Sequence, residues 1–333
     1  MMFLHSHLED TDTNNLCKRD SMKETLSTTH PGIQDGGVPV PQERFSPLVQ
    51  TVPWIALLFG SALTHVIWVE GLGYKDSPTW DYVVRFIVLV ALLTLSWLWP
   101  KLRPLRGFLL AILAFNVAID VQLSLVALPQ VAALPPVLFA LTTALLSVVL
   151  AVVLMALTLI HSGLSRRDLF LSRGNMRARS HLPLPFVSSW RWTLVGPLAF
   201  VVLAIPLIVE LVLEIHPNIA LAHNMLSMLP LIIVFGIINA AQEEFTYRVV
   251  YLARLAPVVG TGQALLITSV NFGINHWVRG HPDGLVGAVT VALAGYILGR
   301  SMLDTRGIAW AWIIHTAADI IVSLLLAMMV VPH

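Results

Sequence analysis

The sequence predicts an all-α protein, a polytopic membrane bundle of about eight to nine transmembrane helices. Of its 333 residues, 56% are hydrophobic and only 12% are Asp, Glu, Lys or Arg. A water-soluble domain of this length could not bury so large an apolar share. Proline and glycine separate apolar runs, most of which have the roughly 20 residues that cross a bilayer as a helix. The runs cover residues 52–70, 82–99, 107–128, 137–160, 192–213, 228–255, 264–277, 285–302 and 308–331.

The runs predict four parts of the chain. Residues 1–47 are rich in Ser, Thr, Asp, His, Gly and Pro and lack the basic start and apolar core of a signal peptide, so we expect a flexible polar tail. A four-helix membrane region at 48–161 follows, then a basic connection at 162–191. The five helices expected within 192–331 carry most of the ionisable residues of the apolar runs. The chain shows no internal repeat.

Lys and Arg cluster in every second connection, which predicts that these connections face the cytoplasm. The N-terminus is then inside and the C-terminus outside. If the short run 264–277 does not span, the last two helices reverse. The long connection 162–191 is either a positive-inside linker or a segment that lies along the anionic inner leaflet. The basic residues are Lys101, Arg103, Arg106, Arg166, Arg167, Arg173, Arg177, Arg179, Arg254, Arg300 and Arg306.

Charge and cysteine content exclude several classes of function. The net charge of +1 provides no basic surface for nucleic acid. A single cysteine, Cys17, excludes an intramolecular disulfide framework and a thiolate zinc site. Any metal would therefore need His and carboxylate ligands.

Two adjacent carboxylates, Glu243 and Glu244, lie in the run 228–255. An ionisable group inside a membrane costs about 3 kcal/mol or more, so it is a functional-site hypothesis by default. Glu244 shares a helix face with Arg248, four residues later, whereas Glu243 points about 100° away. This predicts one structural and one reactive carboxylate. The alternative is a helix end whose charges reach the cytoplasmic water.

His276 lies in the next apolar run, and its depth matches that of Glu243. If the two runs form a hairpin that turns near residues 259–260, Glu243 is about 16 residues before the turn and His276 about 16 after it. At a rise of about 1.5 Å per residue the two side chains then lie at nearly the same depth. A single histidine at a segment end is otherwise more often structural.

The last run contains His315 and Asp319, again four residues apart on one helix face. An Asp in an apolar helix must be protonated, paired or hydrated, and the neighbouring His can pair with it. The pair either fixes helix packing or belongs to a site. Charged or imidazole side chains in three of the last four runs favour a site.

These residues suit peptide hydrolysis. A carboxylate with an imidazole can deprotonate water, and a second imidazole can stabilise the oxyanion that forms. Alternatively, Glu243, His276 and His315 could hold one divalent metal such as Zn²⁺ with an open position for water. The chain has no His-Glu-x-x-His motif, which excludes the zincin arrangement. The residues leave the two ways of activating water open.

Three ordered motifs resemble those of the CAAX protease and bacteriocin-processing (CPBP, or Abi) family of intramembrane proteases. They are EEFTYR at 243–248, FGINH at 272–276 and HTAAD at 315–319, and the stretch 298–315 resembles the lead-in to the last motif. The resemblance covers about residues 192–331 and implies a membrane endopeptidase with a conical, hydrated cavity among the last helices.

The resemblance also implies roles for individual residues. Glu243 with His276 would activate water, Glu244 and Arg248 would support the site, and His315 with Asp319 would stabilise the oxyanion. Some members have Asn where this chain has Asp319, and an ionised Asp cannot donate to an oxyanion, so here it would orient His315 or bind metal.

The substrate is expected to be a membrane-associated peptide or protein, prenylated and CAAX-like or of bacteriocin type, in a bacterial inner membrane. Two other functions remain open. One is a proton-coupled transporter that uses these residues as a proton relay, against which the missing repeat argues. The other is a catalytically inactive immunity or scaffold protein of the same fold. Nothing in the sequence predicts an oligomeric state.

Overall fold

The computed structural model describes residues 46–160, 162–210, 213, 219–277 and 284–330. The predicted polar tail with Cys17 therefore lies, up to residue 45, outside the described residues, as does the connection 278–283. The described residues belong to one compact unit. They are helical, with a single β-bridge between Arg179 and Arg191. The all-α prediction is confirmed, whereas the predicted boundaries at 47, 161 and 191 stay predictions.

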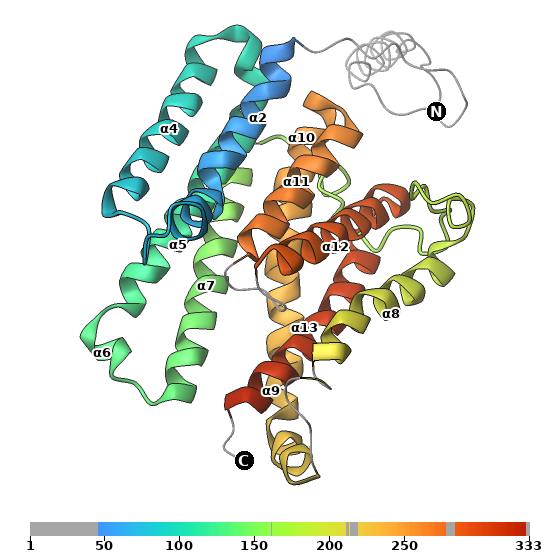
Figure 1. Cartoon of the computed structure of the whole chain (residues 1–333). Coiled ribbons are helices and arrows are strands. Elements are labelled where there is room, and N and C mark those ends of the chain that lie inside the picture. Colours follow the sequence, from blue (N-terminus) through green and yellow to red (C-terminus); the bar gives the residue numbers. More distant parts are fainter. Residues whose placement is uncertain (1–45, 161, 211–212, 214–218, 278–283, 331–333) are drawn as a thin grey trace, which may run out of the picture. The chain divides into compact units, whose positions relative to one another are not determined.

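The long helices of the first region run alternately up and down (Figure 1). Several of its helices begin at a proline. Two of them, α2 and α3, meet at a bend of 61° at residues 61–62. The elements are α2 (Pro47–Gly60), α3 (Leu63–Val66), the π-helical turn η1 (Ile67–Gly71), α4 (Thr79–Leu98), the 3₁₀ turn η2 (Pro100–Leu105), α5 (Arg106–Val126), α6 (Pro129–Ala132) and α7 (Pro136–Leu159).

The second region contains one long helical rod and a hairpin. After α9 the rod continues without a break through a π-helical segment, η4, into α10. Gly260, at φ +87°, then turns the chain into α11, where the sequence predicts the hairpin. The elements are α8 (Trp192–Glu210), α9 (Ile219–Glu244), η4 (Phe245–Leu252), α10 (Ala253–Val259), α11 (Thr261–Asn275), α12 (Gly284–Thr305) and α13 (Ala309–Val330).

Six helices among the described residues are long and apolar enough to cross a membrane, or seven if the bent pair α2–α3 is one span. This indicates a multi-pass membrane protein, with fewer counted spans among the described residues than the eight to nine predicted. The run 52–70 is broken, and the run 264–277 becomes α11, which has only 15 residues. In α13 the side chains are described only as far as Leu325, so Ala309–Leu325 is not counted among the six, although the helix extends to Val330. The six are Thr79–Leu98, Pro100–Val126, Thr142–Leu159, Trp192–Val209, Met228–Val259 and Gly284–Thr305.

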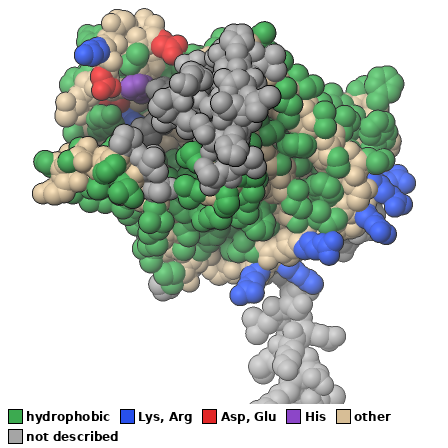
Figure 2. Space-filling model, turned by 90° about the horizontal axis from the view of Figure 1, so that it is seen from below, with side chains coloured by type: hydrophobic (Ala, Val, Ile, Leu, Met, Phe, Trp, Pro, Cys, Tyr) green, Lys and Arg blue, Asp and Glu red, His purple; other side chains and the backbone are tan. Residues whose placement is uncertain are grey.

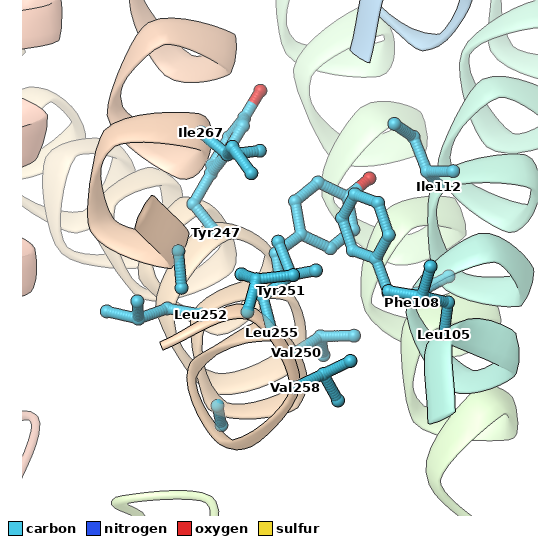
Figure 3. Packing of buried hydrophobic residues seen from close by; sticks show 14 of the residues in the cluster. Leu105, Phe108, Ile112, Tyr247, Val250, Tyr251, Leu252, Leu255, Val258 and Ile267 are labelled. Atoms are coloured by element: carbon cyan, nitrogen blue, oxygen red, sulfur yellow. The ribbon is translucent and has the colours of Figure 1, made fainter. Parts of the chain in front are cut away.

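The main hydrophobic core joins the two regions. In Figure 3 Phe108 and Ile112 of α5 lie against Tyr251 of the rod, and the rings of Phe108 and Tyr251 meet edge to face with centroids 5.6 Å apart. Arg254 of α10 donates hydrogen bonds to the Gly107 and Thr158 carbonyls of α5 and α7. Hydrophobic side chains also cover much of the outer face in Figure 2, which suits contact with lipid.

Two of the basic connections pack together. Asn175 of the long connection donates its backbone N–H to the Thr305 carbonyl, and Ile308 donates to the Ser172 carbonyl. Gly174 and Gly307 approach so closely at this point that a Cβ on either would clash with the other's backbone. The connection is therefore docked on the turn between α12 and α13. Which side of a membrane it faces stays a prediction.

Candidate active site

The site lies where the long rod, the hairpin helix α11 and the last helix meet. Glu243 and Glu244 end α9, and Arg248 lies one turn later in η4. His276 caps the C-terminal end of α11. Helix α13 packs along α9 and brings His315 and Asp319 to the same place. All six predicted site residues, Glu243, Glu244, Arg248, His276, His315 and Asp319, thus belong to one cluster.

Glu244 forms the buried base of the cluster. Its side chain has no exposure, and its Oε1 lies 3.0 Å from the Arg248 guanidinium, itself 2% exposed. The same oxygen accepts a 2.8 Å hydrogen bond from Nδ1 of His315. The guanidinium lies 4.5 Å from the centre of the Phe272 ring. The i, i+4 pair expected from the sequence is present, and it also holds His315.

Glu243 faces both histidines. Its Oε2 lies 3.3 Å from Nε2 of His315 and 3.8 Å from Nε2 of His276. Neither contact has hydrogen-bond geometry, and this oxygen has no hydrogen-bond partner among the described residues. A buried carboxylate oxygen without a partner is uncommon and calls for water or a ligand. The depth match predicted between Glu243 and His276 is present.

The hydrogen bonds of His276 define its tautomer. Its Nδ1 lies 2.8 Å from the Phe272 carbonyl, which can only accept, so Nδ1 donates. In the neutral ring Nε2 is then an unprotonated acceptor, directed toward Glu243. The Phe272 ring meets the His276 and His315 rings edge to face, at 4.6 and 5.6 Å, and fixes both orientations.

Asp319 is held from two sides. Its Oδ1 lies 3.5 Å from Nε2 of His315, and its Oδ2 accepts a 3.1 Å hydrogen bond from Nδ2 of Asn239. Sequence reasoning missed Asn239. Its signal was an amide side chain one helical turn before Glu243 in an otherwise apolar run.

Asn275, next to His276, ties the hairpin to the first region. Its amide donates to the Tyr247 hydroxyl at 2.9 Å and to Asn271 at 2.8 Å, while its oxygen accepts from the Ala62 N–H at 2.9 Å. Ala62 lies in the break between α2 and α3, where the N–H has no partner within the helix. The first region therefore supports the position of His276.

A cavity of about 1020 Å³ opens beside the cluster. Glu243, His276, His315 and Asp319 line it, whereas Glu244 and Arg248 do not. Its wall also includes residues of α4, α5 and α7, so it lies between the two regions rather than within the last helices alone. The two adjacent glutamates are thus not equivalent, because only Glu243 is open to a substrate.

The described residues include no group of three or more His, Cys, Asp or Glu placed to hold a metal ion. The use of Glu243, His276 and His315 as ligands of a divalent metal stays a prediction.

The fold and the cluster define a class of protein, a helical membrane protein with paired carboxylates and histidines on a shared internal cavity. Residues 225–321 match the model of one family, described as Type II CAAX prenyl endopeptidase Rce1-like. This part of the chain, which contains all six clustered residues, is a domain of that family, and the predicted resemblance is confirmed there. The match leaves out α2 to α8. No curated protein and no solved structure matches the chain.

Proposed function

We propose that the protein is an intramembrane endopeptidase that hydrolyses a peptide bond of a membrane-associated substrate with a water activated by Glu243 and His276. One observation carries the proposal. Oε2 of Glu243 makes no strict hydrogen bond within the described residues and lies 3.3 and 3.8 Å from two imidazoles at the wall of a cavity, while the adjacent Glu244 is neutralised by Arg248. The family name, that of a peptide hydrolase, supports the reaction class.

The space between Glu243 and His276 suits a water molecule. Oε2 and Nε2 are both acceptors and lie 3.8 Å apart, too far for a direct hydrogen bond. A water that donates one hydrogen to each would have its lone pairs free to attack a carbonyl carbon. As the new C–O bond forms, one proton passes to this pair and is then given to the leaving amine as the C–N bond breaks.

His315 is suited to stabilise the oxyanion. Its Nδ1 contacts Glu244, and its Nε2 contacts Glu243 and Asp319, so acceptors surround both nitrogens. This surrounding favours the doubly protonated ring, which can donate from Nε2 to a developing negative charge. Glu244, Asp319 and Asn239 would hold the ring in place. Since Asp319 accepts from Asn239, we assign it a positioning role rather than donation to the oxyanion.

The substrate is proposed only as a class, a peptide or protein segment within or at the membrane. The cavity opens among apolar helices, so such a segment would reach it from the bilayer. A prenylated CAAX-like end and a bacteriocin-type precursor are both candidates, and we place the protein in a bacterial inner membrane.

A cleavage assay tests the proposal. The purified protein in lipid nanodiscs would be incubated with a peptide library that includes prenylated and unmodified members, beside Glu243→Ala and His276→Ala. We expect cleavage by the wild type and none by the variants. An absence of cleavage, or equal cleavage by all three proteins, would reject the protease. Chelator treatment of an active preparation, followed by metal analysis, decides between the two ways of activating water. A proton flux in liposomes that depends on Glu243 would support a transporter instead.

A further inference from the structure

Arg85 is a charged residue that the proposed chemistry does not use. It lies in the membrane span Thr79–Leu98 and lines the same cavity as Glu243. Among the described residues of the cavity wall it is the only Lys or Arg. No carboxylate oxygen of those residues lies within 4.0 Å of its guanidinium. Asp120, on the same cavity wall, interacts with Arg85 electrostatically from beyond ion-pair distance. A cation inside a membrane that has no directly paired carboxylate is costly, which makes it a candidate for a functional role.

Neutral groups hold Arg85 in place. Its Nε donates to the Phe59 carbonyl at 2.9 Å, and its NH2 donates to Oδ1 of Asn116 at 2.7 Å. Asn116 in turn donates to the Gly60 carbonyl at 3.1 Å. These bonds satisfy the Phe59 and Gly60 carbonyls, which lack helical partners at the bend between α2 and α3. Arg85 therefore keeps donors free, since a guanidinium has five N–H groups in a fixed fork.

The cavity wall contains two further polar atoms that lack a hydrogen-bond partner among the described residues. Oε1 of Gln122 and Oγ1 of Thr143 are buried without a hydrogen-bond partner, and both residues line the cavity. Gln122 is only 2% exposed. Buried polar atoms without partners are rare in native proteins, so they point to a ligand or water. A peptide backbone supplies both donors and acceptors for such groups.

Arg85 and the catalytic pair lie at similar depth. Arg85 is 13 residues from the end of α4 and Glu243 is 16 residues from the end of α10, which at about 1.5 Å per residue gives ~20 and ~24 Å. The turn η2 after α4 packs against α10, so the two helices end at the same level. The bend between α2 and α3 lies between the two groups and contacts Asn116 on one side and Asn275 on the other. One bound peptide can therefore contact both.

We propose that Arg85 binds a carboxylate of the peptide substrate, either a chain terminus or an Asp or Glu side chain. The inference rests on the proposed endopeptidase function and adds how the substrate is oriented. Glu243 and Asp319 repel an anion, whereas Arg85 attracts it through charge-assisted bonds. A peptide that carries a carboxylate would bind with the carboxylate at Arg85 of α4 and with a neutral amide at Glu243.

The test separates binding from cleavage. The Glu243→Gln protein in phosphatidylcholine nanodiscs is mixed with two mass-labelled pools of apolar peptides, identical except that one has free and the other amidated C-termini. A second pair of pools compares internal Asp and Glu with Asn and Gln. Mass spectrometry of the retained peptides gives the acid-to-neutral ratio. We expect a preference of about tenfold or more for at least one acid pool, the value of one charge-assisted hydrogen bond.

Variants decide whether Arg85 causes that preference. Adding Arg85→Gln should bring the ratio close to one, and Arg85→Lys, which keeps the charge, should retain part of it. Asp120→Asn is the matched control, since Asp120 is an opposite charge on the same wall, and it should leave the preference intact or raise it. If Arg85→Gln does not fold, as judged by gel filtration, the acid-to-neutral ratio of Arg85→Lys is compared with that of Asp120→Asn instead.

The inference is overturned if neither acid pool is preferred, or if the preference survives Arg85→Gln. Retention of phosphatidylglycerol that depends on Arg85, with no acid preference, would assign the site to a lipid phosphate instead. Because binding is measured without cleavage, an inactive wild type rejects the protease and leaves this ratio unaffected. Equal cleavage of acid and amidated peptides by an active wild type would reject the carboxylate subsite alone.

Discussion

The two regions of the molecule treat buried charge differently. In the first region Asp81, only 4% exposed, accepts hydrogen bonds from the Thr64 hydroxyl at 3.0 Å and the Trp68 indole at 3.1 Å. Its partners are neutral donors that keep their protons. In the second region Glu243 and Glu244 meet imidazoles and a guanidinium, and one oxygen of Glu243 has no hydrogen-bond partner.

This difference shows that a charge inside a membrane span does not by itself indicate chemistry. An Asp surrounded by neutral donors is satisfied and resembles a packing feature. A carboxylate between two imidazoles, which can accept and donate protons, is suited to catalysis. The kind of partner, rather than the burial of the charge, separates the two regions.

Replacing Glu243 should have the largest effect on activity and almost none on stability. Glu243→Gln keeps the shape but removes the base, so cleavage should fall about 10⁴-fold, at the upper end for a general base. The melting temperature should stay within about 2 °C, because the lost oxygen has no hydrogen-bond partner among the described residues. A large loss of stability would instead assign Glu243 to the structural base of the cluster.

Replacing Glu244 should reverse this pattern. Glu244→Gln leaves Arg248 buried without its counterion, which should cost about 3–5 kcal/mol in the free energy of unfolding. Denaturation in detergent measures that loss. The double variant Glu244→Gln/Arg248→Met should recover most of the stability but not the activity, because His315 has still lost its carboxylate. If Glu244→Gln melts like the wild type, the pair does not support the fold.

Replacing Asp319 should have a moderate effect. Asp319→Asn keeps an oxygen that can accept from Asn239 but removes the negative charge beside His315. We expect cleavage to fall about tenfold, as for one weakened charge-assisted hydrogen bond. Steady-state kinetics should show the loss in kcat rather than in KM. A KM effect alone would place Asp319 in substrate binding.

Replacing Asp81 should have the smallest effect and no effect on catalysis. Asp81→Asn keeps one acceptor for Thr64 or Trp68, so the free energy of unfolding should fall by about 1–2 kcal/mol. The cleavage rate at a temperature well below the melting transition should match that of the wild type. A strong loss of activity in a folded Asp81→Asn protein would contradict the division between the two regions.

Local spacing predicts much of the site. The four-residue interval places Glu244 against Arg248, and the turn at Gly260 places His276 at the level of Glu243. Both depend only on helix geometry and on one glycine. The contact of His315 with Glu244 could not be predicted in this way, because it depends on how α13 packs along α9. Asn239 was missed for the same reason.

The number of spans was harder to predict. The run 52–70 is apolar enough on average to resemble one span, although Gly60 and Ser61 stand at the bend. Asn116, Asn275 and Arg85, from distant helices, form hydrogen bonds with the backbone groups that lack helical partners at this bend. The run 264–277 forms a helix that ends one residue before His276, where the chain turns at the cavity. At the bend between α2 and α3, polar side chains from distant helices satisfy the exposed backbone groups, and hydropathy alone does not show such contacts.

The most direct measurement of the central claim is isotope incorporation during cleavage. Wild-type protein in nanodiscs would digest the peptide library in H₂¹⁸O beside the Glu243→Gln variant, with the products read by mass spectrometry. We predict one ¹⁸O in each newly formed carboxylate with the wild type, and no products with the variant. Products that form equally with Glu243→Gln, or an absence of cleavage by the wild type, would contradict the assignment of Glu243 as the residue that activates water.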